Sequence, residues 1–88
     1  MNGRALLAWN LRRLRGDRGV SQERLAADTG VDRAYVSELE RQQGNATVDM
    51  LDRLAAMLDV GIAEFFLEPS VDDELPKALP RGRRPRSK

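Results

Sequence analysis

With 88 residues and a mass of 9.9 kDa, the chain has room for one small domain, because domains generally run to about 100–200 residues. It contains neither cysteine nor histidine, which excludes disulfides, catalytic dyads and triads that use these side chains, and metal sites built on sulfur or imidazole. The chain has fifteen Lys and Arg residues and fourteen Asp and Glu residues, which gives a net charge of +1. This net charge does not by itself indicate a nucleic-acid partner. Catalysis would have to rest on carboxylates alone, and we expect neither an enzyme nor a bound metal or cofactor.

The first apolar segment of the chain does not have the features of a targeting sequence. This segment, at residues 5–9, is followed at once by Arg12, Arg13 and Arg15. It is too short for the apolar core of a secretion signal and far too short to span a bilayer. We therefore expect a cytoplasmic protein with no membrane partner.

The chain divides near residue 68 into two parts of different composition. Residues 1–66 contain no proline and carry nine basic against ten acidic side chains, whereas all four prolines lie at position 69 or beyond. The last eight residues, RGRRPRSK, carry five positive charges and no negative one. Such a segment cannot bury enough apolar surface to offset the entropy lost on ordering. We predict a folded domain at 1–68 and a flexible, Pro-rich, basic-ended tail at 69–88.

The first predicted element is a helix. Leu7, Leu11 and Leu14 recur at the spacing that places them on one helical face. Gly16 and Gly19 follow, and each would cost about 1 kcal/mol inside a helix. The first helix is therefore expected to end at these glycines.

Two short helices come next, separated by three residues. Ser21 suits the N-cap position of a helix at 22–29, and Gly30 stands where a helix C-terminus favours glycine. Asp32 then suits the N-cap position of a helix at 33–42.

The remaining elements are a fourth helix and a last turn. Thr47 suits the N-cap of the fourth helix, in which apolar residues recur at helical spacing: Leu51, Leu54, Ala55 and Leu58. A last turn covers 62–66. No alternating run of β-branched residues, which would indicate a strand, occurs in the sequence. We predict an all-α domain with five helices.

The interval from Ser21 to Leu39 has the plan of a helix-turn-helix motif: a short helix, a three-residue break with Gly30 and Val31, and a second short helix. Glycine accepts positive φ at little steric cost, which lets two helices cross sharply. The stretch GVSQERLAADTGVDRAYVSELER, followed by NATVDMLDRLAAMLDV, resembles the Cro- and lambda-repressor-like (XRE) helix-turn-helix family. The resemblance extends over roughly residues 4–66.

A narrower resemblance concerns the segment DRAYVSELER, the N-x-T that follows it, and the double phenylalanine after the fourth helix. These features are similar to the small controller proteins of restriction–modification systems. The resemblance implies a five-helix, lambda-repressor-like fold and a dimeric DNA-binding regulator. Two positions depart from the family pattern: Ala46 stands where proline is common, and Arg24 where a capping-box acid is common. Neither position belongs to the surface expected to read DNA.

The helix predicted at 33–42 is the candidate for reading base pairs, because a helix fits the major groove, where base edges differ. Val36 and Leu39 must face its buried side. We expect base contacts from four residues towards its N-terminus: Arg33, Ala34, Ser37 and Glu38. Arg33 has the fork geometry that reads guanine. The alternative is that Arg33 is an ordinary solvated arginine at the start of a helix.

Contacts to the DNA backbone are expected from residues around this helix. Gln22 opens the preceding helix, where free N–H groups and the helix dipole favour a phosphate, and the family resemblance implies the same contact. The resemblance also implies a DNA contact from Tyr35. The alternative role for this side chain is partial burial beneath the preceding helix. The other candidates are Arg41, Asn45 and Thr47, although capping alone would account for Thr47.

The resemblance assigns a structural role to Arg15 and Glu40. In the family, an arginine near the end of the first helix pairs with the acid of the Leu-Glu-Arg segment and ties the two helices together. We therefore expect a salt bridge between these two residues, which removes Arg15 from the candidates for DNA contact.

An apolar cluster at the end of the domain is the candidate for self-association: Ile62, Phe65, Phe66 and Leu67. Two adjacent phenylalanines cannot both enter the same small core, so we expect one to close the monomer and the other to meet a second copy. The alternative is that both close the monomer. A dimer would bring two recognition helices to half-sites about 34–36 Å apart on a palindromic operator.

The sequence therefore predicts a homodimeric, sequence-specific DNA-binding transcriptional regulator. The basic residues at 81–88 would either add phosphate contacts or only solubilise the chain. An alternative of another class is an antitoxin-type protein, whose tail binds a toxin as protein partner while the domain represses its own promoter. A helical domain that binds only proteins is a third possibility.

Overall fold

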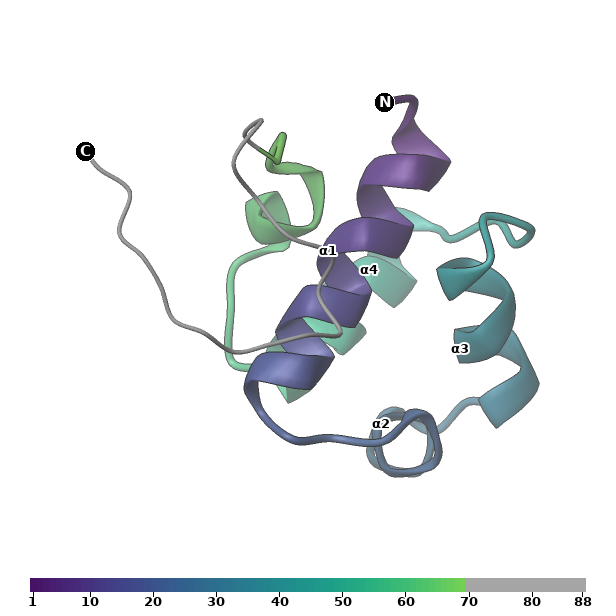
Figure 1. The fold of residues 1–88 in the computed structure, drawn as a ribbon. Coiled ribbons are helices and arrows are strands. Elements are labelled where there is room, and N and C mark those ends of the chain that lie inside the picture. Colours follow the sequence, from purple (N-terminus) through teal and green to yellow (C-terminus); the bar gives the residue numbers. More distant parts are fainter. Residues whose placement is uncertain (70–88) are drawn as a thin grey trace.

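The computed structural model describes residues 1–69 as four α-helices and one 3₁₀ helix (Figure 1). The elements are, in chain order, α1 (Gly3–Asp17), α2 (Gln22–Thr29), α3 (Arg33–Glu40), α4 (Val48–Met57) and η1 (Ile62–Phe66). This part of the chain contains no strand, so the all-α prediction is confirmed. None of the helices in residues 1–69 combines the length and the apolar character that a membrane crossing requires. The predicted tail lies outside the described residues, apart from Pro69.

The predicted count of five helices is not confirmed, because the last element is a 3₁₀ helix rather than an α-helix. The backbone is extended at Gly61, immediately before η1, and extended again at Leu67, immediately after it. Only five residues remain between these two points, and 3₁₀ geometry is typical of such short helical segments.

Short polar side chains mark the starts of the helices. The side chains of Asn2, Ser21 and Thr47 each accept a hydrogen bond from the backbone N–H three residues further on, at 2.9–3.0 Å. Such a cap is worth about 1 kcal/mol. Asp32 occupies the N-cap position of α3, as predicted, but its side chain makes no capping hydrogen bond. The first turn of α3 therefore begins without side-chain capping.

Residues with positive φ follow the ends of α2 and α3. Gly30, after α2, has a φ of 84°, and both Gly30 and Val31 donate their N–H to the carbonyl oxygen of Ala26. The predicted break at this glycine is confirmed. By contrast, α3 ends at Glu40, two residues earlier than predicted, because Gln42 has a φ of 63°, which lies outside the α-helical region.

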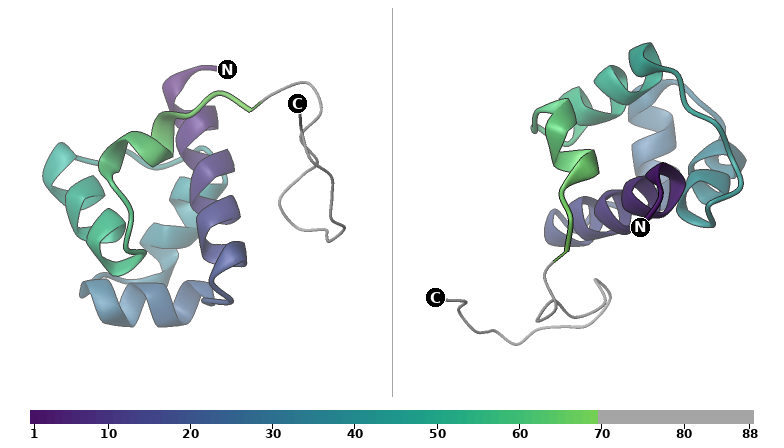
Figure 2. Two further views of the ribbon diagram at one scale, coloured as in Figure 1. Left: turned by 90° about the vertical axis from the view of Figure 1, so that its left-hand side faces the viewer. Right: turned by 90° about the horizontal axis from the view of Figure 1, so that it is seen from above.

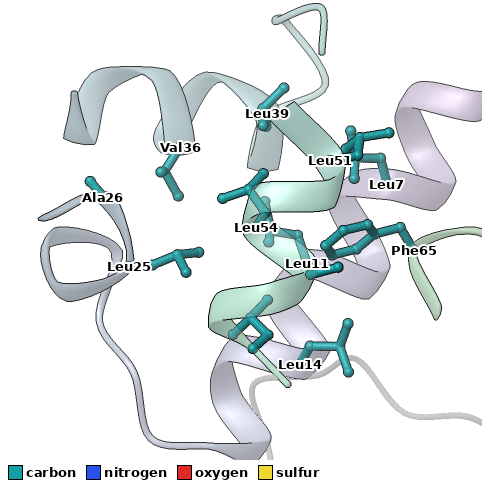
Figure 3. Packing of buried hydrophobic residues seen from close by; sticks show 12 residues of the cluster. Leu7, Leu11, Leu14, Leu25, Ala26, Val36, Leu39, Leu51, Leu54 and Phe65 are labelled. Carbon is teal, nitrogen blue, oxygen red and sulfur yellow. The ribbon is translucent and has the colours of Figure 1, made fainter. Parts of the chain in front are cut away.

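The core is aliphatic around one aromatic ring (Figure 3). Leucines of α1 and α4 meet at its centre, and Phe65 of η1 is completely buried among them. Two residues of α2 and two of α3 belong to the same cluster: Leu25, Ala26, Val36 and Leu39. Burial of this apolar surface is the main favourable contribution that holds α2 and α3 on the rest of the domain.

Candidate nucleic-acid interface

α2, α3 and the connection at 41–47 lie on one side of the molecule, and η1 lies on the other side of α1 (Figure 1). The view from above shows the same separation (Figure 2, right). α3 faces the core through Val36 and Leu39, which are 0% and 1% exposed. The helix predicted to read DNA therefore has one buried face and one face open to solvent.

The outer face of α3 carries the four residues expected to read bases. Arg33, Ala34 and Glu38 are exposed, whereas Ser37 is half-buried. The Ser37 hydroxyl accepts a hydrogen bond from Arg41 Nη1 at 2.6 Å. A hydroxyl can donate its own proton while it accepts, and a guanidinium has five N–H donors. Both side chains therefore keep donors for another partner.

Arg33 is the first residue of α3, and 53% of its side chain is exposed. Its Nη1 lies 3.4 Å from Gln22 Oε1, and its Nε lies 3.7 Å from Glu23 Oε2. Both contacts are long, and exposed ion pairs of this kind contribute little to stability. The guanidinium thus lies beside the start of α2 while most of its planar fork remains available to a ligand.

A hydrogen-bonded network around Glu40 joins α1, α2 and α3. Arg15 donates from Nε and Nη2 to the two Glu40 carboxylate oxygens at 2.6 and 2.8 Å, which confirms the predicted ion pair. The hydrogen bond from Arg15 to Glu40 raises the pKa of Arg15, although burial opposes the increase. Gln22 Nε2 donates to Glu40 Oε1 at 3.0 Å. Gln22 keeps its second amide hydrogen at the N-terminus of α2, where helix geometry favours an anion.

The connection after α3 is held by a hydrogen bond from α3 itself. Tyr35 is half-buried against the core, and its hydroxyl donates to the carbonyl oxygen of Asn45 at 3.0 Å. Burial raises the pKa of Tyr35. Asn45 and Thr47 are both exposed, and the Thr47 side chain caps α4. The partial burial that the sequence left open for Tyr35 is therefore present in the structure.

Two residues beside this surface were not predicted from the sequence. Glu23 forms an ion pair with Arg33, which joins the first turns of α2 and α3. The predicted turn between these helices is the sequence feature that could have indicated this pair. Arg4, in the first turn of α1, donates to the Gly44 carbonyl and to the Asn45 side chain. Arg4 and Gly44 are 40 positions apart, so no local spacing indicates their contact.

The apolar cluster expected to mediate self-association divides into buried and exposed residues. Phe65 has no exposed surface and cannot contact a second copy, so it is removed from the predicted interface. Phe66 and Leu67 are 42% and 48% exposed, and Ile62 is half-buried. Buried Asn10 fixes this segment by donating to the carbonyl oxygens of Phe65 and Leu67 at 3.0 and 2.9 Å. One phenylalanine closes the monomer and the other remains outside.

The crossing of α2 and α3 at the Gly30 turn defines a helix-turn-helix domain. Residues 11–65 match the helix-turn-helix family HTH_3. This match covers more than half of the 88 residues, and the chain therefore belongs to that family. The resemblance to Cro- and lambda-repressor-like regulators is thereby confirmed.

Individual relatives include regulators of transcription and controllers of restriction–modification systems. The chain is 42% identical over 66 residues to a hypothetical transcription factor of Neisseria meningitidis, an alignment that covers 75% of this chain and 62% of that protein. The crystal structure of a Neisseria factor of this description has a TM-score of 0.74 at 41% identity, covering 77% of this chain and 78% of that chain. The restriction-modification controller protein C.AhdI from Aeromonas hydrophila has a TM-score of 0.69 at 40% identity, covering 72% of this chain and 96% of that chain. Control protein C.SmaI of Serratia marcescens is 31% identical over 74 residues, covering 84% of this chain and 88% of that protein. The chain thus spans less than two thirds of the first of these relatives.

Proposed function

We propose that this helix-turn-helix transcription regulator binds double-stranded DNA as a homodimer, with α3 of each copy in the major groove of a palindromic operator. The observation that carries the proposal is the exposed outer face of α3, whose opposite face is fixed in the core. A helix presented in this way matches the dimensions of the major groove. Residues near the N-terminus of a recognition helix commonly make the base contacts.

The proposed base contacts follow from the chemistry of four exposed or half-buried side chains of α3. Arg33 would donate from its fork to guanine O6 and N7, a contact worth about 1–3 kcal/mol of discrimination. Ala34 offers a methyl group to thymine, and Ser37 offers a hydroxyl that donates or accepts. Glu38 would accept from the amino group of cytosine.

The proposed backbone contacts surround these base contacts on three elements. Gln22 would donate its second amide hydrogen to a phosphate at the start of α2, and Arg41 would add a charged donor at the end of α3. Asn45 and Thr47 would approach the phosphates from the connection that leads to α4. Tyr35 supports this set through its hydrogen bond to the Asn45 carbonyl.

Homodimerisation would supply the affinity that one short helix lacks. In a two-fold dimer the same surface of each copy meets its counterpart, and Phe66 and Leu67 are the exposed apolar residues available for this role. Two recognition helices would then reach half-sites about one helical turn, or 34–36 Å, apart. Binding near a promoter would exclude polymerase, and binding upstream of it would recruit polymerase.

Selection of bound sequences from random duplexes tests this proposal. We expect an enriched consensus with two-fold symmetry and a guanine in each half-site. The Arg33→Ala variant should lose the preference for this guanine, with affinity for the consensus reduced by about tenfold or more. The absence of any enriched sequence, or a consensus without symmetry, would contradict the proposal.

A further inference from the structure

We propose that Arg4 is a positioning residue for DNA binding: it orients the Asn45 amide so that the amide's NH2 group faces a phosphate. This inference rests on the function proposed above and adds a residue of α1 to the binding machinery. Arg4 acts through Asn45 in this proposal rather than as a ligand of DNA.

The contacts of Arg4 converge on two consecutive residues of the connection after α3. Its Nε donates to the Gly44 carbonyl oxygen at 3.2 Å. Its Nη2 donates to the side-chain oxygen Oδ1 of Asn45. The Asn45 carbonyl oxygen accepts from the Tyr35 hydroxyl at 3.0 Å. One arginine and one tyrosine, from two helices, therefore hold two backbone carbonyls and one side-chain oxygen.

The backbone that carries Asn45 has little freedom to move away from these donors. A Cβ added to Gly44 would lie 3.2 Å from Leu39 Cδ2, which shows how closely the connection passes over α3. Gln42 has a φ of 63°, a conformation that costs a non-glycine residue energy and persists only where its surroundings enforce it. The position of the connection is thus set by the packing of α3, and Arg4 sets the orientation of the exposed amide.

The orientation matters because the two ends of an asparagine amide have opposite hydrogen-bonding properties. The oxygen only accepts, and the nitrogen only donates. A phosphate also only accepts, so a rotated amide would present an acceptor to an acceptor. Because Arg4 occupies Oδ1, the exposed nitrogen is the end left to donate to DNA.

Substitution of Arg4 by lysine separates positioning from charge. Lysine keeps the positive charge but lacks the planar fork that reaches Gly44 and Asn45 together. We expect Arg4→Lys to bind the selected operator about tenfold more weakly, the effect of one lost hydrogen bond to a charged group. The dependence of affinity on salt should not change, because the number of charged contacts stays the same.

A double-mutant cycle with Asn45→Ala makes the test specific to the proposed pathway. In the Asn45→Ala background, Arg4→Lys should change operator affinity by less than about twofold, because the amide to be positioned is gone. Arg12→Lys is the matched control, since Arg12 is exposed on the same helix and its side chain makes no hydrogen bond or ion pair within residues 1–69. Thermal unfolding should be the same for all these variants, because the side chains are exposed.

The outcomes divide clearly. Weaker binding by Arg4→Lys that disappears in the Asn45→Ala background, with a shifted Asn45 side-chain amide signal in the free protein, supports positioning. Wild-type affinity in Arg4→Lys, or an equal loss in both backgrounds, overturns it. Arg4→Ala lowering the salt slope by about one, with Arg4→Lys unaffected, would make Arg4 a phosphate ligand and also overturns it. If the wild-type chain selects no DNA sequence, the proposed function fails together with this inference.

Discussion

Glu40 of α3 is hydrogen-bonded to α1 and to α2, and so links three helices. Its side chain is 5% exposed and receives hydrogen bonds from both Arg15 and Gln22. A buried carboxylate is costly unless such donors compensate for the water it loses. Because Gln22 donates to Glu40, the carboxylate also fixes the side chain of Gln22, which is the residue proposed to contact a phosphate at the start of α2.

The Glu40→Gln variant tests this role. Glutamine replaces one carboxylate oxygen with an NH2 group, which cannot accept a hydrogen bond from Arg15. We expect the free energy of unfolding in urea to fall by about 2 kcal/mol, the scale of a hydrogen bond to a charged group. As a control, Arg24→Ala removes an exposed ion pair with Asp28 and should cost no more than about 1 kcal/mol. Equal losses in the two variants would contradict the network.

Tyr35 gives a second prediction at the scale of one residue, and it is the only tyrosine in the chain. Burial raises its pKa, so the folded state holds the phenol proton more tightly than the unfolded state does. This contribution to stability is present below the ordinary pKa of about 10 and is lost as the pH rises through the higher folded value. Absorbance at the phenolate band should show a midpoint above that of the chain in urea. A midpoint equal to the unfolded one would contradict the burial of this ring.

Among the elements, α2 and α3 depend most on their surroundings. Each has eight residues, and isolated helices of that length are unstable in water. The Ser21 cap of α2 and the packing of both helices against α1 and α4 therefore decide whether α2 and α3 form. The Gly30 turn between them determines the angle at which α3 leaves α2.

Gly30→Ala tests the turn. The φ of 84° disfavours alanine, and the added Cβ would lie 3.2 Å from Arg53 Nη2, which donates to the Thr29 carbonyl oxygen at 2.6 Å. We expect a loss of about 1–2 kcal/mol in the free energy of unfolding. The matched control is Gly61→Ala, where φ is −81° and nothing lies within 4 Å of the new Cβ. This control should be neutral or more stable by up to about 1 kcal/mol, and a comparable loss there would refute the argument.

The bounds of α2 and α3 differ in how far the sequence could predict them. The bounds of α2 were predictable because Ser21 and Gly30 act locally, through a cap and a left-handed turn. The end of α3 was not, because Gln42 adopts positive φ under the constraint of packing rather than by its own preference. The contact between Arg4 and Asn45 was not predictable either, since it joins α1 to the connection after α3, and only the complete core establishes their relative position.

At the scale of the whole molecule, the helical part of the chain is close to electrically neutral. Residues 1–66 carry nine basic and ten acidic side chains, so attraction to DNA must come from local placement rather than from net charge. Salt bridges reduce the free positive charge further: Arg13 pairs with Glu64 and Arg15 with Glu40. Of these two pairs, only the one between Arg13 and Glu64 involves η1, so the positive charge of Arg13 is already balanced by a carboxylate of that element.

The exposed end of η1 provides the prediction that tests the assembly. Phe66→Asp places a charge at a 42%-exposed ring that is outside the core, so the monomer should stay folded. A two-fold interface contains this change twice, and we expect dimerisation to weaken by about 100-fold or more, seen as monomers in sedimentation at micromolar concentration. Trp9, the only tryptophan, lines the same surface hollow as Leu67, so its fluorescence should respond to dilution of the wild type and not of the variant. Val48→Asp is the control, because Val48 is also an exposed apolar residue, at 67%, but belongs to α4 rather than to η1. Sedimentation of Phe66→Asp that is indistinguishable from wild type would exclude η1 from the interface.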